Sequence, residues 1–180
     1  MVYCFLADGF EELEAIAPID MLKRAGVEVV TAGVTGKNVT GSHGITFVAD
    51  VTAEEVALTD ELEAVILPGG MPGTLNLEKS SIVQKAIDYA VSKEKYVCAI
   101  CAAPSILGHK GLLKGKKATA FPGFEEDLEG AITDNYFVAH DGRFITARGA
   151  GVATEFGLEI VSALVSAEKS AEIKATIQSR

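Results

Sequence analysis

Cys101 is the residue of this sequence best placed to act as a nucleophile. It follows an apolar run, residues 96–100, that predicts a buried strand, and it precedes a helical stretch that begins at Ala102. Such an abrupt turn projects its residue from the carboxyl edge of a sheet, as a nucleophile elbow with sulfur in place of the usual hydroxyl. Because the start of a helix carries partial positive charge, we expect a lowered thiol pKa. The alternative is a small buried hydrophobe, which we expect of Cys98.

Cys98 and Cys101 also spell C-x-x-C, the pattern of a thioredoxin-like redox disulfide. In extended chain, three residues separate the two α-carbons by about 10 Å. A disulfide needs roughly 4.4 to 6.8 Å. We therefore expect a lone reactive thiol at Cys101 rather than a redox pair.

Glu14 is the second candidate for chemistry. It lies in a helix predicted over residues 11–25, near the carboxyl edge of the sheet. Pro18 cannot donate to the carbonyl of residue 14, so the helix should kink at the turn that holds this carboxylate. The residues themselves leave two interpretations open. Glu14 could take part in chemistry, or it could be an ordinary acidic residue of a first helical turn, as Glu11 and Glu12 are expected to be.

Glycine-rich loops are expected at the same edge of the sheet. Gly69 and Gly70 follow a buried strand within the loop of residues 68–73, and their amides could turn toward a bound oxygen or anion. A tight turn with no binding role is the alternative. Residues 149–151 match only the first part, G-x-G, of the dinucleotide-binding pattern G-x-G-x-x-G, so we expect no bound nucleotide.

The order of elements predicts an α/β fold. Short apolar runs alternate with helical stretches, as in a parallel sheet covered by helices on both faces. Asp8 stands where it could cap the first helix, with Glu11 at the box position, and Asp141-Gly142 predicts a hairpin turn. The expected strands cover residues 2–7, 28–32, 64–67, 96–100, 136–140 and 143–147, with an extended pair over 39–50; the expected helices cover 11–25, a short one opening at 52–55, 81–92, 102–107, 151–164 and 167–177.

Composition sets the broad class. The 180 residues are 48% hydrophobic, enough for one domain over residues 1–180 with a core of its own. A net charge of −9 argues against nucleic acid or anionic membrane as a primary partner. No apolar run approaches the ~20 residues of a membrane span.

Three cysteines without an export signal indicate a reducing compartment, so we expect a cytoplasmic protein. No Cys/His cluster has metal-ligand spacing, and we expect no metal and no cofactor.

Taken together, four blocks of sequence resemble the DJ-one branch of the ThiJ/PfpI superfamily, closest to the bacterial YajL type. Their order and spacing hold over about residues 1–170. The resemblance implies a flavodoxin-like three-layer α/β/α sandwich with a mostly parallel central sheet, similar to class I glutamine amidotransferases, and usually a homodimer. The blocks are GFEELE at 9–14 with Pro18 and Asp20, LPGG at 67–70, AICAAP at 99–104 and RGAG at 148–151.

The resemblance also implies roles for single residues. Cys101 would be the elbow cysteine, and Glu14 a protonated glutamate that donates a hydrogen bond to the thiolate or to its sulfinate. Gly70 and Ala102 match the family's backbone amides around the pocket. The implied activity is a defence against reactive carbonyls, acting on small aldehydes as a glyoxalase or on glycated side chains as a deglycase. The alternative is an oxidative-stress sensor or redox-regulated chaperone that works through oxidation of Cys101.

Three positions qualify the resemblance. Protease-like members carry a histidine directly after the cysteine, so Ala102 argues against a PfpI-type protease. Animal members carry a histidine before a proline where this chain has Phe121, which removes the obvious general base. His43 stands where relatives place a basic residue at the dimer interface, and it is the candidate for a contribution from the partner subunit.

Overall fold

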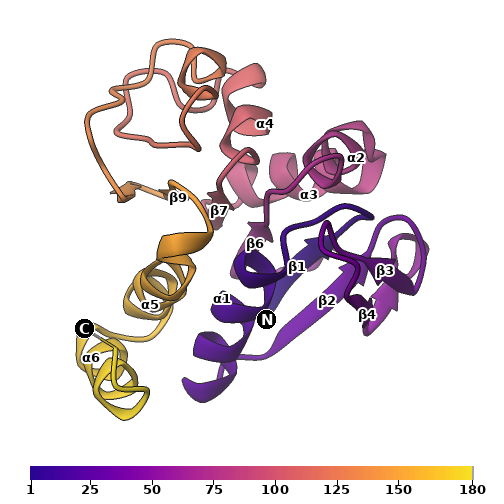
Figure 1. Cartoon of the computed structure of the whole chain (residues 1–180), viewed down its shortest axis with the longest axis horizontal. Coiled ribbons are helices and arrows are strands. Elements are labelled where there is room, and N and C mark those ends of the chain that lie inside the picture. Colours follow the sequence, from indigo (N-terminus) through magenta and orange to yellow (C-terminus); the bar gives the residue numbers. More distant parts are fainter. Residues whose placement is uncertain (180) are drawn as a thin grey trace.

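The computed structural model describes residues 1–179 and is built on a seven-stranded sheet in the order β5-β2-β1-β6-β7-β9-β8 (Figure 1). Neighbouring strands are parallel except β8, which runs antiparallel to β9. A separate antiparallel hairpin is formed by β3 and β4. The strands are β1 (Val2–Leu6), β2 (Val29–Gly33), β3 (Asn38–Thr40), β4 (Thr46–Val48), β5 (Val51–Thr52), β6 (Ala64–Leu67), β7 (Tyr96–Ile100), β8 (Val138–Asp141) and β9 (Phe144–Ala147).

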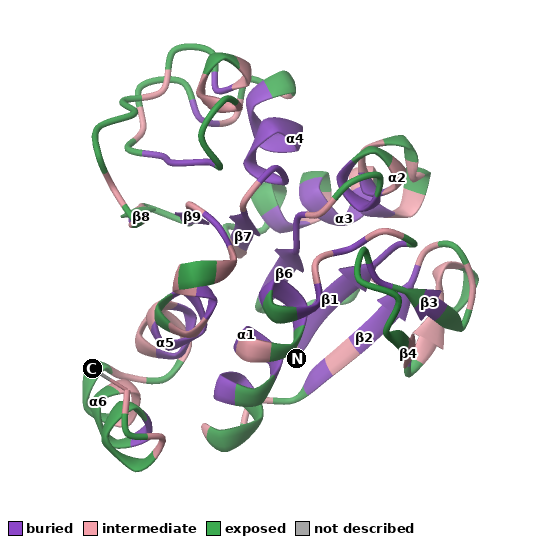
Figure 2. Ribbon diagram, viewed as in Figure 1, coloured by how far each residue is buried: buried purple, intermediate pink, exposed green. Residues whose placement is uncertain are grey.

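Helices cover both faces of the sheet, which confirms the predicted α/β/α sandwich. Side chains of β1 alternate, so that Cys4 faces one apolar core and Phe5 faces the other. The first core is closed by α1, α5 and α6, and the second by α2, α3 and α4 (Figure 2). The helices are α1 (Glu12–Arg24), α2 (Gly73–Lys79), α3 (Ser81–Ser92), α4 (Pro104–His109), α5 (Ala153–Leu164) and α6 (Ala167–Thr176), with single 3₁₀ turns η1 (Ala53–Glu55), η2 (Glu125–Asp127) and η3 (Ala150–Val152).

The packing of α1 against α5 is close because a glycine faces a proline there. Pro18 lies inside α1 without ending it. A Cβ on Gly157 of α5 would lie 2.7 Å from the Pro18 Cα, so only glycine permits this separation.

Three local expectations are corrected by the structure. Asp8 does not cap α1; its side chain accepts a hydrogen bond from the Thr40 amide, and Glu11 is the N-cap instead. The chain turns through Gly9, at φ +85°, before the helix begins, which leaves Asp8 too far back to cap it. The sequence predicts a loop over residues 68–73 and no helix before residue 81, whereas α2 begins at Gly73. The helix after Cys101 begins at Pro104 rather than at Ala102.

The predicted hairpins are both present, one around residues 41–45 and one around Gly142. Among residues 1–179 there is no helix with the length and apolar character needed to cross a bilayer.

Candidate functional site

Four loops meet at the carboxyl edge of the sheet, where open α/β folds bind their ligands. They follow β1, β6, β7 and β9, which are neighbours in the sheet. The loop after β1 leads to Glu14, the loop after β6 holds Gly69, and the turn after β7 holds Cys101. The segment after β9 holds Gly149 and Ala150. The topology thus brings together residues that are distant in the sequence.

Cys101 occupies a nucleophile elbow, as predicted. Its φ is +64°, in the left-handed region that non-glycine residues seldom adopt. Two backbone hydrogen bonds fix it: its amide donates to the Ala147 carbonyl at 2.9 Å, and its carbonyl accepts from the Phe121 amide at 2.8 Å. The side chain is half-buried, whereas Cys4 and Cys98 are fully buried, and all three cysteines are unbridged. The strained turn therefore presents Cys101 alone of the three toward solvent.

Glu14 points from the first turn of α1 toward Cys101. Its backbone amide is capped by the Glu11 side chain at 2.9 Å, and its own side chain is only 1% exposed. The carboxyl group is hydrogen-bonded to the Cys101 side chain and accepts from the Gly69 amide at 2.9 Å and from the Ala150 amide. An acidic residue of a first turn would ordinarily face solvent, so this buried geometry favours the functional reading over the ordinary one.

The glycine loop after β6 is shaped around this pair. A Cβ on Gly69 would lie 2.7 Å from both the Cys101 Cβ and the Glu14 Oε2, so any other residue would displace one of them. The Gly69 amide is committed to Glu14. The amides of Gly70, at φ +89°, and Ala102 are the ones that hydrogen-bond with the Cys101 side chain. Of the three predicted amides, that of Gly69 thus binds Glu14, and those of Gly70 and Ala102 bind Cys101.

The titration of Cys101 differs from the sequence expectation, whereas that of Glu14 shifts in the direction of the protonated glutamate that the resemblance implies. Burial, together with the charge of Glu11, raises the pKa of Glu14 to about 7. Burial and the negative charge of Glu14 raise the pKa of the Cys101 thiol to about 12, against the opposing effect of the Ala102 and Gly70 amides. The expected lowering of this pKa is therefore wrong: α4 is a short helix that starts at Pro104, and a carboxylate lies beside the sulfur.

Glu14 and Cys101 titrate as a coupled pair, and above the raised pKa of Glu14 the two groups share one remaining proton. With the proton on Glu14, the thiolate of Cys101 accepts hydrogen bonds from the carboxyl group and from two amides. With the proton on Cys101, the carboxylate is held by the Gly69 and Ala150 amides. A thiolate beside a neutral carboxylic acid is one of these two arrangements of the shared proton.

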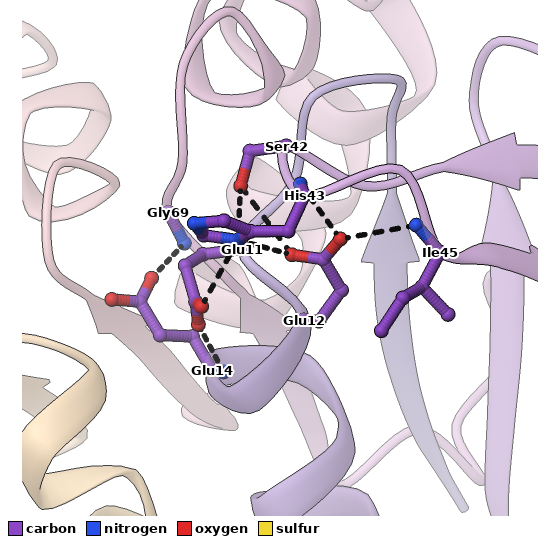
Figure 3. Close-up of polar contacts among 7 residues, drawn as sticks. All are labelled: Glu11, Glu12, Glu14, Ser42, His43, Ile45 and Gly69. Atoms are coloured by element: carbon purple, nitrogen blue, oxygen red, sulfur yellow. Dashed lines mark hydrogen bonds and ion pairs between the residues drawn. The ribbon is translucent and has the colours of Figure 1, made fainter.

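Glu12 is an anchor that sequence reasoning missed, because it was grouped with the ordinary acidic residues of a first turn. Its side chain is 5% exposed and accepts from the His43 amide and the His43 Nδ1, each at 2.9 Å (Figure 3). Burial alone would raise the pKa of Glu12, but hydrogen bonds from His43 and neighbouring amides lower it to about 2. A charged Glu12 thus ties the turn of residues 41–45 to the start of α1.

Within one chain, His43 does not belong to the Cys101–Glu14 pair. Its imidazole is largely exposed and contacts Glu12 and, at 3.8 Å, Glu11, while Glu14 points away from it toward Gly69 (Figure 3). The bond to Glu12 raises the pKa of His43. In residues 1–179, the group whose ligand atoms could surround a metal ion is Glu11, Glu12 and His43, which lie within 4.8 Å of one another. The hydrogen bonds above already use these carboxylates.

An apolar cavity of about 370 Å³ lies next to the pair. The Phe121 amide bonds to Cys101 and the Ala150 amide bonds to Glu14, so two of its walls are attached to the candidate catalytic residues. The sequence identifies Phe121 only as the position where animal relatives carry a histidine, and not as part of a cavity. The cavity is lined by Phe121, Pro122, Phe137, Arg148, Gly149, Ala150, Gly151 and Val152.

Comparison with known proteins identifies the relatives of this chain. The model of the DJ-1/PfpI family matches residues 1–163. The chain belongs to the DJ-1/PfpI family. Within it, the chain is 37% identical over 171 residues to protein dj-1beta of Drosophila melanogaster, with 93% of this chain and 91% of the relative covered. These findings confirm the resemblance to the DJ-1 branch.

Two further members of the family are informative. A protein of Pyrococcus abyssi named as a deglycase is 37% identical over 150 residues, which cover 81% of this chain and 87% of that protein. The solved structure of oxidized DJ-1 from Toxoplasma gondii superposes with a TM-score of 0.93 at 32% identity, and covers 98% of this chain and 97% of that chain. The fold and the branch of the family are thus shared across distant organisms.

Proposed function

We propose that the protein is a cysteine-dependent enzyme that acts on reactive carbonyl compounds. The observation that carries the proposal is the hydrogen bond between half-buried Cys101, at an elbow, and Glu14, whose raised pKa of about 7 lets the carboxyl group hold or release a proton near neutral pH. The deglycase name of the Pyrococcus relative supports the same class of substrate.

The chemistry follows from the one-proton state of the pair. The Cys101 thiolate adds to the aldehyde carbon of a 2-oxoaldehyde, forming a C–S bond, and the carbonyl electron pair moves to oxygen, which takes the proton of Glu14. The amides of Gly70 and Ala102 steady the developing oxyanion. Glu14, now a carboxylate, moves a proton from the former aldehyde carbon to the neighbouring carbon, and the proton of the new hydroxyl group passes to the neighbouring oxygen, which yields a thioester with a 2-hydroxyl group. Water then releases a 2-hydroxy acid and restores the thiol, so the net reaction consumes one water molecule.

Consumption of methylglyoxal and formation of lactate by the Cys101→Ala variant test this function. We expect loss of at least ~100-fold of the activity, because the variant lacks the nucleophile. Cys98→Ala, which removes a fully buried thiol of the same segment, is the matched control and should keep its activity. Undiminished consumption of methylglyoxal by Cys101→Ala contradicts the proposal. Following a protein-bound adduct in the presence of an aldehyde scavenger separates deglycase from glyoxalase activity.

A second candidate is a redox sensor, favoured by the oxidized state named for the Toxoplasma relative. Here the Cys101 thiolate attacks peroxide to give a sulfenate and water, and a second peroxide gives the sulfinate. A protonated Glu14 would donate a hydrogen bond to the sulfinate oxygen, and the Gly70 amide would donate another. A partner, or a chaperone surface on the protein itself, would then read the change.

We also propose that the protein works as a homodimer in the reducing environment of the cytoplasm. Exposed apolar side chains of α1 and of the turn before β4 support this, since Leu13 is 60%, Ile16 41% and Ile45 57% exposed. Glu12 links these two segments through the Ile45 amide, so they form one continuous surface. In such a dimer, His43 could approach the pair of the other subunit.

A further inference from the structure

The cavity beside the pair has mostly apolar walls. Phe121 and Phe137 are 48% and 61% exposed, although large aromatic side chains usually lie inside a protein. With Pro122 and Val152 they line a hollow of about 370 Å³. Apolar side chains that line a concave site next to polar groups are typical of small-molecule pockets.

The cavity and the Cys101–Glu14 pair share structural parts. The Phe121 amide donates to the Cys101 carbonyl at 2.8 Å, and the Ala150 amide donates to Glu14. Gly149 lies between them: a Cβ there would be 3.3 Å from the Phe121 ring and 4.0 Å from the Glu14 Oε1. Gly149, which lines the cavity, is therefore a direct neighbour of Glu14.

Charge limits what the cavity can accept. Among the described residues 1–179, Arg148 is the charged residue of its lining, and no carboxylate forms part of it. The guanidinium is held by the Asn135 Oδ1 at 3.0 Å and lies over the Phe137 ring, 5.6 Å from its centroid. A cationic group in the cavity would meet this guanidinium, and repulsion between like charges is unfavourable. The cavity suits uncharged apolar groups instead.

We propose that this cavity is a subsite for the substituent of a 2-oxoaldehyde substrate, and that it favours uncharged branched or aromatic substituents over small or cationic ones. The proposal rests on the proposed enzymatic function and adds the class of substrate. Each buried CH₂ group should raise kcat/KM by about four-fold until the cavity is filled. Glycated lysine and arginine side chains, where cationic, are then poor ligands of this subsite.

Alkylation of Cys101 tests the subsite without turnover. In this reaction the thiolate forms a C–S bond and releases iodide, and peptide mass mapping separates Cys101 from Cys4 and Cys98. The measured quantity is the ratio of the rate constants for iodoacetanilide, which carries a phenyl group, and for iodoacetamide, divided by the same ratio for glutathione. We expect a preference of about five-fold or more in the native protein.

Variants then assign the preference to the cavity. Phe137→Ser and Phe121→Ser should each reduce the normalised ratio several-fold, and both positions are exposed enough for the fold to persist, which circular dichroism checks. Val165→Ser, at an exposed apolar position outside the cavity, should leave the ratio unchanged. A native ratio equal to that of glutathione, or a ratio unaffected by both phenylalanine variants, overturns the subsite.

A second measurement separates failure of the subsite from failure of the proposed function. It compares kcat/KM for isobutylglyoxal with that for methylglyoxal, and we expect the branched substrate to be favoured in the native protein and the preference to shrink in Phe137→Ser. Consumption of both aldehydes without preference contradicts the subsite alone. An alkylation preference with no consumption of either aldehyde contradicts the enzymatic function, and with it the assignment of a substrate to the cavity.

Discussion

Glu14 and Cys101 are hydrogen-bonded across the carboxyl edge of the sheet, one from the first turn of α1 and the other from the turn after β7. Each changes the protonation of the other: a negative charge on Glu14 raises the pKa of the thiol, and the hydrogen bond with Cys101 opposes the rise that burial causes in the pKa of Glu14. The Gly69 amide fixes the carboxyl group at 2.9 Å. The reactivity of the cysteine thus depends on a residue that the topology, rather than the local sequence, places beside it.

Replacement of Glu14 tests this dependence. Glu14→Gln removes the negative charge but keeps the size of the side chain, so the pKa of Cys101 should fall from about 12, as followed by thiolate absorbance or by the pH dependence of alkylation. Turnover of methylglyoxal should nevertheless fall by about 10²–10⁴-fold, because glutamine cannot relay a proton. A more reactive thiol combined with a slower enzyme is the expected signature.

The control for this variant is Glu155→Gln. Glu155 is likewise acidic and in the first turn of a helix, α5, but it is exposed. It should change neither the thiol titration nor turnover. If Glu14→Gln leaves the titration of Cys101 where it is in the native protein, the two groups are not coupled, and the proposed proton relay fails.

Gly69→Ala tests the close approach of the loop to the pair. The new Cβ would lie 2.7 Å from both the Cys101 Cβ and the Glu14 Oε2, and 2.9 Å from the Ile100 carbonyl oxygen. Overpacking of this kind should lower the free energy of unfolding by roughly 1–3 kcal/mol, as measured by urea denaturation. Methylglyoxal turnover should also fall in the fraction of the variant that stays folded, because the new Cβ displaces the pair. Gly151→Ala is the control for stability, since a Cβ there meets nothing within 4 Å.

Much of this arrangement could be predicted from the sequence, for identifiable reasons. The elbow at Cys101 follows from an apolar run that passes into a helix, and the alternation of β and α segments gave the layers. The partners of Glu12 could not be predicted, because its bonds to His43 and Ile45 depend on where the β3–β4 hairpin lies. For the same reason the pKa of Cys101 was predicted in the wrong direction: the burial and the carboxylate that raise it are tertiary features.

Glu12 should contribute to stability in a pH-dependent way. Its pKa in the folded protein is about 2, against an ordinary value of 4.5, so the ionised form stabilises the fold fully above about pH 4.5 and the stabilisation is lost as the pH falls toward 2. Glu12→Gln should cost roughly 1–3 kcal/mol at pH 7, since buried donors lose a charged acceptor. Urea denaturation of both proteins at pH 7 and at about pH 3 should show a smaller difference at the lower pH. A difference that is the same at both values would mean that the charge of Glu12 is not what holds the turn.

Peroxide should oxidise one cysteine selectively. Burial raises the pKa of Cys4 to about 12 and that of Cys98 further still, and neither side chain is exposed. The pKa of Cys101 is also raised to about 12, but Cys101 is half-buried and peroxide can reach its sulfur, so it should gain two oxygen atoms before the others react. Intact mass with peptide mapping during a peroxide titration checks this. Modification of Cys4 or Cys98 ahead of Cys101, or a trapped Cys98–Cys101 disulfide, would rule out a sulfinate sensor at the elbow.

The proposed homodimer predicts a specific effect of charge on the surface formed by Leu13, Ile16 and Ile45. Ile16→Glu places a carboxylate where the partner's apolar side chains would lie, and burial of an unpaired charge is unfavourable, so light scattering coupled to size exclusion should show a monomer. Val165→Glu, which adds the same charge at an exposed apolar position at the end of α5, should leave the mass unchanged. If the native protein already elutes with the mass of one chain, the exposed side chains of α1 do not serve self-association, and any contribution of His43 to a second subunit is excluded with it.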